Sequence, residues 1–419
     1  MSVRKRTWSN GKGDVRTGWQ YDFCDLNGKR QRKQFRTKRE ADAFRVKIEG
    51  QLAGGSFRGE SQTTTVRDLA LTYLAHAEGR SIRGERFTRG HLLTVTGHIW
   101  NYICPDAEHR VKRKVKTQVR LFEDGVGHLK LAHLTTRAIG DLRDRLRNVG
   151  VGVITTRKIL STLSAMLAFA VSKDLVAFNP ATGIRVIGRR DEGAKKIVPP
   201  SKEAMRAIIA VADPDFRVQI IFAAASAVRA GEHHALRWRH IDFEAGEVAI
   251  ETRVDVWGEE DTTKTTAGVR TVPLASSVLT MLKEWRLRSR FGRDDDLVFP
   301  NRRGGYLGHG SMVKRKFYPL FRKLEKLHQT APSEHAPAPK RFNWHALRHF
   351  GISTWIEADL KPKTIQTFAG HSSLQVTMDC PLNLLSMLFL GRRTEPWDRH
   401  HQGSPQGRVM RPPRLRIIA

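Results

Sequence analysis

The sequence predicts a mainly α-helical protein with small β-sheets (α+β), organised as three globular units. Two patterns predict this class: apolar residues recur at helical spacing through most of 62–185, and short alternating, strand-like stretches occur near the N-terminus and around 247–274. With 419 residues the chain is long enough for two or three domains. We expect units at 1–58, 62–185 and 197–380, followed by an atypical tail at 381–419.

The charge balance indicates a polyanionic partner. The chain has 73 Lys and Arg against 42 Asp and Glu, a formal net charge of +31. Such an excess attracts nucleic acid, because neutralising phosphates releases condensed counterions. An anionic membrane surface or general solubility is the alternative explanation. Duplex DNA is the partner that we expect.

Cysteine usage and the N-terminus favour a cytoplasmic protein. Cys24, Cys104 and Cys380 are widely separated and odd in number, which indicates neither a disulfide framework nor a zinc module. The basic N-terminal residues 1–8 lead into no apolar segment of a signal peptide. No apolar run reaches the roughly 18 residues that a membrane span needs. We therefore expect no membrane association.

The first unit is expected to be a small sheet followed by one helix. Residues 19–23 alternate as a strand does, 25–28 have turn chemistry, and 29–35 form a second strand candidate. Thr37 and Glu40 predict a capping box for a helix with Ala41, Phe44 and Ile48 on its apolar face. This basic unit suits DNA contact, although a solvated N-terminus is the alternative. Its expected DNA-binding residues are Arg30, Arg32 and Lys33.

The second unit is expected to be helical. One amphipathic helix begins at 65–74, and another is marked by a stripe that we expect in the core: Ile159, Leu160, Leu163, Met166, Leu167 and Ala170. The basic run 110–116, with Lys112, Arg113 and Lys114, is either a phosphate clamp or a solvated insertion. Asn179 and Pro180 end the helical region, and 188–200 is a charged linker.

The third unit has a mixed pattern. A helix at 201–212 precedes the apolar run 220–225. Residues 247–256 predict a half-buried strand with Val248, Ile250, Val254 and Val256 on one side, and 269–274 predict its return strand. Further helices are expected around 279–285, 313–327 and 345–358, with a loop at 331–339.

Two arginines of the third unit have the chemistry of a phosphate clamp. A guanidinium stays charged and can bind two phosphate oxygens at once. Arg229 lies where an apolar helix meets a turn at Gly231, and Arg348 lies one helical turn after His345, on the same face. For a lone arginine a solvated surface position would be the default interpretation, but the two together, in these surroundings, indicate phosphate binding.

Other residues near these arginines could transfer protons. Lys264, between the two predicted strands, could act as a general acid, and His345 and His371 could donate to phosphate or carry a proton. Gly370 would allow the backbone to approach the phosphate closely.

We expect no metal and no cofactor. His345 and His349 are spaced like zinc ligands, but Ala346 stands where the metalloprotease motif has Glu, and no third ligand is in view. His233 and His234 are interpreted as the edge of a groove or of the core rather than as ligands.

These motifs, in this order, resemble the tyrosine recombinases of the phage integrase family. They are Arg-x-Gly-Glu at 229–232, Leu-Arg-Trp at 236–238, Lys264 before 270–274, His-x-x-Arg-His at 345–349 and Gly-His at 370–371. The resemblance implies a helical core-binding (SAM-like) domain and a mixed α/β catalytic domain that enclose duplex DNA, preceded by an arm-type DNA-binding module. It further implies strand exchange through a 3′-phosphotyrosyl link without ATP, and a homotetramer on attachment sites if the C-terminal end is competent. By position, the catalytic roles fall to Arg229, Lys264, His345, Arg348 and His371, with Glu232 orienting them.

The chain departs from the family at the nucleophile. The resemblance places the attacking tyrosine at 380 or 381, where this chain has Cys380 and Pro381, and no tyrosine follows Tyr318. A cysteine nucleophile is disfavoured, because its thiolate needs an activating environment. The tail from Cys380 has arginines but no lysine. A shift of reading frame near codon 380 would explain this change, and a genuinely divergent tail is the alternative.

Three functions are open at this point. The first is a site-specific recombinase or integrase of a mobile element or prophage. The second is a catalytically inactive relic or regulator that binds DNA, or that receives a tyrosine in trans from another subunit. The third is a basic architectural protein. The resemblance favours the first for origin and fold, and the missing tyrosine puts cleavage by this chain in doubt.

Overall fold

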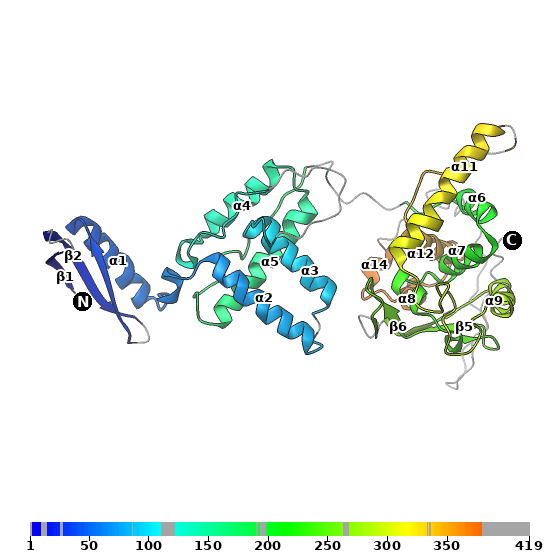
Figure 1. Ribbon diagram of the computed structural model, residues 1–419, viewed down its shortest axis with the longest axis horizontal. Helices are drawn as coiled ribbons and strands as arrows, with labels where there is room; N and C mark the ends of the chain where they lie inside the picture. Colours follow the sequence, from blue (N-terminus) through cyan, green and yellow to red (C-terminus); the bar gives the residue numbers. More distant parts are fainter. Residues whose placement is uncertain are drawn as a thin grey trace, which may run out of the picture. The chain divides into compact units, whose positions relative to one another are not determined.

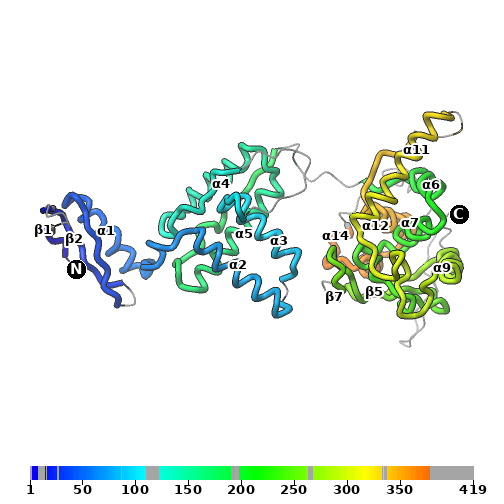
Figure 2. The backbone as a smooth tube through the Cα atoms, viewed as in Figure 1, coloured from blue at the N-terminus to red at the C-terminus, as the bar shows by residue number. Residues whose placement is uncertain are grey.

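The computed structural model divides into two units, Met1–Ala194 and Lys195–Ala419, which are described separately (Figures 1 and 2). Within them the structure describes residues 2–9, 15–25, 28–85, 87–109, 122–189, 192, 198–262, 268–332, 334 and 337–378.

The first unit begins with a three-stranded antiparallel sheet. Its strands, in spatial order, are β1 (Ser2–Ser9), β2 (Val15–Cys24) and β3 (Arg30–Phe35), and helix α1 (Lys38–Ala53) packs against it (Figure 1). The predicted helix cap is confirmed, because Glu40 N donates to Thr37 Oγ1 at 3.2 Å and Thr37 N donates to Glu40 Oε2 at 3.3 Å. The predicted second strand is confirmed as β3. The first predicted strand is longer than expected, and β1 was not predicted because its charged residues hide the alternation.

The rest of the first unit is helical and has its own apolar core. Its helices are α2 (Val66–Ile82), α3 (Arg89–His98), α4 (Thr136–Asn148) and α5 (Val153–Ser172), with short helical turns at Glu60–Gln62, Ile99–Ile103 and Leu131–His133. The predicted stripe is confirmed, because Ile159, Leu163, Met166 and Ala170 are all fully buried. Helix α5 ends at Ser172, before the end that Asn179 and Pro180 predicted.

Helix α5 corrects the expectation that no apolar run is long enough to cross a membrane. Its 20 residues meet the length and composition of a membrane span, and half of the most apolar window is buried inside the unit. Its stripe supplies the centre of the helical core, as a core helix does.

The second unit combines helices with two small antiparallel sheets. The bounds of its longer helices are α6 (Lys202–Val211), α7 (Pro214–Ser226), α9 (Ser276–Arg288), α11 (Tyr318–Thr330), α12 (His345–Glu357) and α13 (Pro362–Ala369). The shorter ones are α8 (Ala230–Ala235), α10 (His309–Met312) and α14 (Leu374–Met378), with helical turns at Trp238–His240 and Val313–Phe317. The strands are β4 (Ile241–Asp242), β5 (Glu247–Ile250), β6 (Thr252–Val254), β7 (Glu260–Thr262) and β8 (Arg270–Pro273). The predicted helices of this unit are confirmed, with shifts of a few residues at their ends.

The strand predicted at 247–256 is interrupted. Strand β5 pairs with β8, as the return strand predicted, but β6 pairs with β7 in a separate hairpin. Val256 is 80% exposed, so the expectation that it shares the buried side is wrong. It lies in the turn of the hairpin, where Asp255 N donates to Glu259 O and the alternation no longer describes a sheet face.

Helices α7 and α12 pack unusually closely. A Cβ atom at Gly351 of α12 would lie 2.3 Å from the carbonyl oxygen of Ala224 in α7, so only glycine fits. Phe222 of α7 contributes to one apolar cluster of this unit and Ile220 to the other. The close approach brings Arg348, three residues before Gly351, to the C-terminal end of α7.

Candidate functional site

Arg348 is buried at the end of α7. Ala227 ends this helix in the left-handed conformation, with φ 49°, and its carbonyl accepts from Arg348 Nη1 at 2.6 Å. Arg348 Nη2 donates to Ala369 O at 2.5 Å. The residue is only 3% exposed, so its guanidinium is held by the backbone of two separate segments.

Three consecutive carbonyls at the C-terminal end of α13 each bind one arginine. Phe368 O accepts from Arg270 Nε at 2.7 Å, and Ala369 O and Gly370 O accept from Arg348 and from Arg229 Nη2 at 2.7 Å. The C-terminal end of a helix carries partial negative charge, which stabilises cations there. Gly370 has φ 63°, the left-handed conformation that glycine tolerates best. We call Arg229, Arg270 and Arg348 the arginine cluster.

Glu232 of α8 is the acid within this cluster. Its Oε1 accepts from Arg229 Nη1 at 2.8 Å and from Arg270 Nη1 at 3.2 Å, and its Oε2 accepts from Arg229 N and Arg270 Nη2, both at 2.8 Å. Burial alone would raise the pKa of the Glu232 carboxyl, but its hydrogen bonds and ion pairs with Arg270, and then with Arg229, lower it to about 2. The carboxylate is therefore ionised.

Arg229 is the exposed member of the cluster. Its side chain is 42% exposed, whereas those of Arg270 and Glu232 are 1% and 2% exposed. Its backbone is extended at the start of α8, not at a turn of Gly231, which lies inside α8 and packs against the carbonyl of Val254. The described residues offer acceptors to only two of its guanidinium N–H groups. The remaining donors can bind an external anion.

Two predicted histidines lie beside the arginines as neutral imidazoles. His371 is 8% exposed, and its Nδ1 shares a hydrogen bond of 3.0 Å with Thr377 Oγ1. Burial, followed by the charges of Arg348 and Arg229, lowers the pKa of His371 to about 4. His345, the first residue of α12, is more exposed, and desolvation of its ring followed by His349 and Arg348 also lowers its pKa to about 4.

His349 lies close to His345, at a ring centroid distance of 4.9 Å and with the rings perpendicular. Neither of its ring nitrogens has a hydrogen-bond partner within the described ranges. No third ligand group converges on the pair there either.

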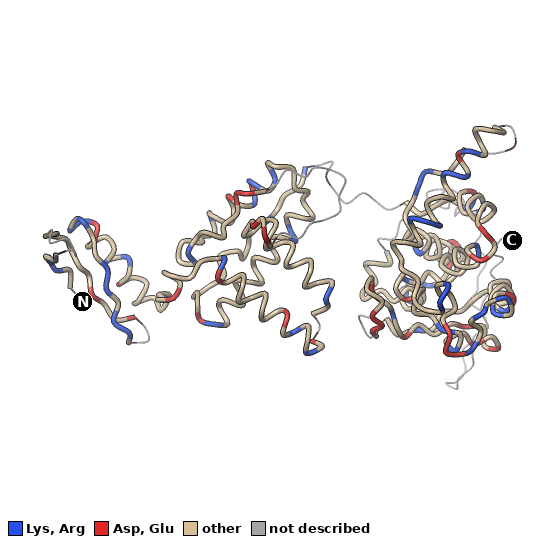
Figure 3. Tube along the Cα trace, in the orientation of Figure 1, with Lys and Arg blue, Asp and Glu red and all other residues tan. Residues whose placement is uncertain are grey.

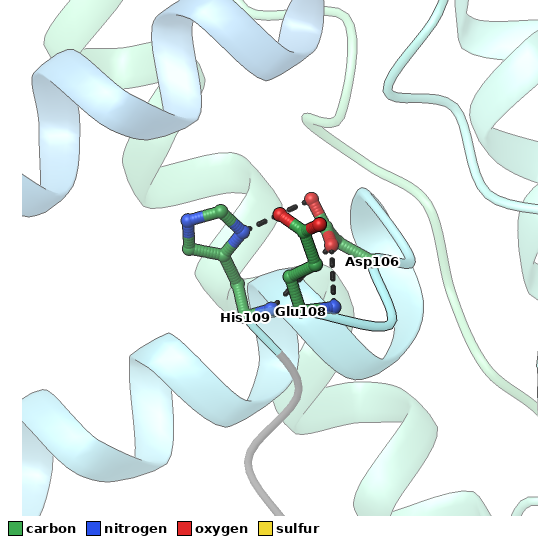
Figure 4. Close-up of side chains that lie close together, drawn as sticks. All are labelled: Asp106, Glu108 and His109. Carbon is green, nitrogen blue, oxygen red and sulfur yellow. Dashed lines mark hydrogen bonds and ion pairs between the residues drawn. The ribbon is translucent and has the colours of Figure 1, made fainter.

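The one convergent group of metal-ligand side chains in the described residues is in the first unit. Asp106, Glu108 and His109 form it (Figure 4). The Asp106 carboxylate already accepts from Arg67, from Glu108 N at 2.8 Å and from His109 Nδ1 at 3.1 Å. These bonds, that of Arg67 first, hold its pKa well below the usual range. The group is compensated internally and serves to fix its loop.

His233 and His234 are buried in the core. The ring of His233 stacks on Phe299 with centroids 4.5 Å apart, and His234 Nε2 lies 3.3 Å from His309 Nδ1. Burial lowers the pKa of His234 to about 3, with the charge of His309 as the second cause. These rings are core residues, not the wall of a groove.

Several predicted site residues lie outside the described residues. They are Lys264, the basic run with Lys112, Arg113 and Lys114, and the nucleophile position at Cys380 and Pro381. Of the others, the structure brings together Arg229, Glu232, His345, Arg348 and His371 through shared contacts or charges.

The basic sheet presents its arginines on the face opposite to α1. Asp22 pairs with Arg32 across the β2–β3 ladder and Tyr21 with Lys33, so the arginines and Lys33 point to opposite faces. Arg30 and Arg32 both lie 3.3 Å from the Asp22 carboxylate, whereas Lys33 Nζ lies 4.2 Å from the ring centroid of Phe44 in α1. Figure 3 marks the Lys and Arg positions along these strands.

Arg270 was missed by the reasoning from sequence, although its motif was noted. Its position carries a signal, because Arg270, Val272 and Leu274 alternate on one side of β8 and the two apolar residues are buried. A charged residue on the inward side of a strand indicates a buried partner.

Residues 201–379 match the phage integrase family. The chain is 25% identical over 382 residues to a "Tyrosine recombinase XerC-like" protein of Caldanaerobacter subterraneus subsp. tengcongensis, covering 84% of this chain and 88% of that protein. It is 27% identical over 177 residues to the prophage integrase IntR of Escherichia coli (strain K12), covering 42% and 41% of the two chains.

Among solved structures, the chain resembles the Tn1549 transposon integrase in complex with transposon right end DNA. The TM-score is 0.59 at 18% identity, and the match covers 78% of this chain and 98% of that one. A second complex of that integrase, with circular intermediate DNA, matches with a TM-score of 0.51 at 19% identity over 64% of this chain and 89% of that one. These likenesses establish a common fold: mainly α-helical, with small antiparallel sheets.

Proposed function

The chain belongs to the phage integrase family of tyrosine recombinases, and from this premise we propose that it binds duplex DNA at a recombination site but does not cut it. The observation that carries the proposal is the arginine cluster, with one guanidinium that still offers donors, in a chain that has Cys380 and Pro381 in place of the nucleophile.

In this proposal Arg229 binds the phosphate directly. Among the described residues, Arg229 and Arg270 both pair with the Glu232 carboxylate, so two guanidinium groups share one negative charge. An anionic phosphate entering beside Arg229 would meet this positive charge, close to Arg348, which binds the neighbouring carbonyl of the α13 end. Both arginines suit the charge that develops on a five-coordinate phosphorus. Glu232 orients Arg229 by accepting from its backbone and its side chain.

Lys264, His345 and His371 keep their proposed proton-transfer roles. A phosphate anion would raise the pKa of both histidines, because it stabilises the imidazolium form. Each could then donate to a phosphate oxygen. Lys264 would protonate the leaving 5′ oxygen, and these roles require a nucleophile that this chain does not supply at 380–381.

The N-terminal sheet is proposed as an accessory, arm-type DNA-binding module at 1–58, with Arg30 and Arg32 in contact with DNA. Lys33 lies on the α1 side of the sheet, so it is not part of that contact. The helical segment 62–185 and the segment 197–380 are proposed as the core-binding and catalytic domains, and Lys112, Arg113 and Lys114 as a further phosphate contact. The proposed setting is the cytoplasm of a bacterium, on a mobile element or prophage, with a homotetramer on attachment-site DNA if the C-terminal end is competent.

A chain that binds without cutting would act as a relic or regulator of recombination. The same arginine cluster and the same missing nucleophile favour it, since a protein that binds without cutting could compete with an active recombinase. The second candidate is a recombinase subunit that receives its tyrosine in trans from another subunit. Mixing this chain with an active relative on one DNA site separates this candidate from a chain that only binds.

The salt dependence of DNA binding tests the phosphate-binding role. Each lost phosphate contact should make the plot of log association constant against log salt concentration shallower by about 0.9. We expect Arg229→Ala to lose about one contact. Arg239→Ala is the matched control, because Arg239 pairs with Asp295 at the surface of the same unit. Equal slopes for the wild type and Arg229→Ala would refute the role of Arg229 and favour a basic architectural protein.

A further inference from the structure

Arg270 and Glu232 form a buried ion pair. Their side chains form two parallel hydrogen bonds, Nη1 to Oε1 at 3.2 Å and Nη2 to Oε2 at 2.8 Å, with 1% and 2% of the side chains exposed. Arg270 also donates to Phe368 O at 2.7 Å and to Gly268 O at 2.8 Å. It is thus enclosed by protein acceptors.

We propose that Arg270 is a positioning residue that neutralises Glu232 and thereby keeps Arg229 available for the DNA phosphate. The inference rests on the proposed function and adds to it a residue that acts through another.

Arg229 and Arg270 share the Glu232 carboxylate. Arg229 Nη1 and Arg270 Nη1 bind the same oxygen, Oε1, so the two guanidinium groups divide one negative charge. Without Arg270, the buried carboxylate would keep Arg229 as its only cationic partner. An ion pair in a site of low polarity is strong, and a buried carboxylate left short of partners is costly. Arg229 would therefore turn towards Glu232 and withdraw from phosphate.

The same pair also fixes the acceptor side of the site. Through Nε, Arg270 binds Phe368 O, which directly precedes the carbonyls that hold Arg348 and Arg229. Strand β8, helix α8 and the end of α13 thus meet at one guanidinium. Because Arg270 anchors these segments, its substitution should lower the stability of the fold. Because Arg270 also shares the Glu232 charge, its substitution should weaken phosphate binding, and removal of the Glu232 charge should counteract that loss.

The test compares four full-length proteins in salt-dependent binding to one duplex DNA: wild type, Arg270→Met, Arg270→Met with Glu232→Gln, and Arg270→Lys. Thermal unfolding of each establishes that it is folded. We expect the slope for Arg270→Met to be shallower than the wild-type slope by about 0.9, as for Arg229→Ala. The double variant should have a steeper slope than Arg270→Met, because no carboxylate competes for Arg229. Arg270→Lys should keep that slope because it retains the charge.

Comparison with Arg229→Ala distinguishes failure of this inference from failure of the proposed function. If Arg229→Ala changes the slope but Arg270→Met does not, the inference is wrong and the proposed function stands. If Arg270→Met and the double variant lose the slope equally, Arg270 has only a structural role. If Arg270→Met fails to fold, Arg270→Lys decides: a wild-type slope supports the inference, and a reduced slope overturns it. If Arg229→Ala itself has the wild-type slope, the proposed function has failed.

Discussion

Arg348 Nη1 donates a 2.6 Å hydrogen bond to the carbonyl oxygen of Ala227, which precedes it by 121 residues. Ala227 provides this acceptor from the left-handed conformation, which costs a residue other than glycine about 1–2 kcal/mol. Backbone strain of this kind persists where the surroundings hold it. Here the surroundings are the close contact of α7 with α12, and this contact therefore supports the arginine cluster.

Gly351→Ala tests that contact. The new Cβ would lie 2.3 Å from Ala224 O and 3.0 Å from Ala227 Cβ, so the helices must separate. We expect a loss of about 1–3 kcal/mol in the free energy of unfolding, measured by urea denaturation. Gly310→Ala is the control, since nothing lies within 4 Å of a Cβ there. Similar losses in the two variants would contradict this account of the packing.

Gly370→Ala tests the end of α13. Gly370 has φ 63° and Gly246 has φ 73°, so alanine at either position meets the same left-handed conformation and should cost about 1–2 kcal/mol. Only Gly370 presents its carbonyl to Arg229. We expect both variants to lose stability, and only Gly370→Ala to change the salt dependence of DNA binding. A change of the same size in Gly246→Ala would show that the effect is not specific to the arginine cluster.

Stability should fall as the pH is lowered from 6.5 to about 4.5. Burial holds the pKa of His234 at about 3, and that of His371 at about 4, below the ordinary value of 6.5. The unfolded chain therefore binds more protons than the folded one in this window, and the free energy of unfolding rises with pH. Urea denaturation at several pH values measures the slope.

His234→Leu should flatten this pH dependence, because it removes one buried imidazole that must stay neutral. The window stops near 4.5 because Glu232, whose pKa is lowered to about 2, contributes with the same sign below that pH. An unchanged pH dependence in His234→Leu would contradict the assignment.

Arg32→Ala should weaken DNA binding through the N-terminal sheet. Arg32 pairs with Asp22 and is 54% exposed on the face away from α1. Arg45 of α1 makes a comparable pair with Asp42 and is 40% exposed. We expect Arg32→Ala to have a shallower salt dependence than the wild type and Arg45→Ala to have the same salt dependence as the wild type, measured by fluorescence anisotropy. Equal effects would indicate general charge rather than a specific face of the sheet.

Local signals in the sequence predicted much of the fold. The Thr37–Glu40 cap and the stripe of α5 depend on residues a few positions apart, and both are confirmed. The interrupted strand after Ile250 was not predicted, because alternation does not encode the change of partner strand between β5 and β6.

The candidate site was predicted only in part. Motif order indicated Arg229 and Arg348, but each also binds a carbonyl at the end of α13, 141 and 21 residues further along the chain. The sharing of Glu232 with Arg270 likewise depends on tertiary packing between α8 and β8. Such long-range contacts leave only a weak trace in the sequence, such as a charged residue on the inward side of β8.

In the proposed function, this chain holds a DNA phosphate and does not break the strand. A nicked suicide duplex containing a site selected by binding tests it directly, because a tyrosine recombinase that cuts such a site becomes trapped as a covalent adduct. We expect a retarded complex on a native gel, weakened by Arg229→Ala, and no protein–DNA adduct on a denaturing gel. An adduct formed by the purified chain alone would contradict the claim.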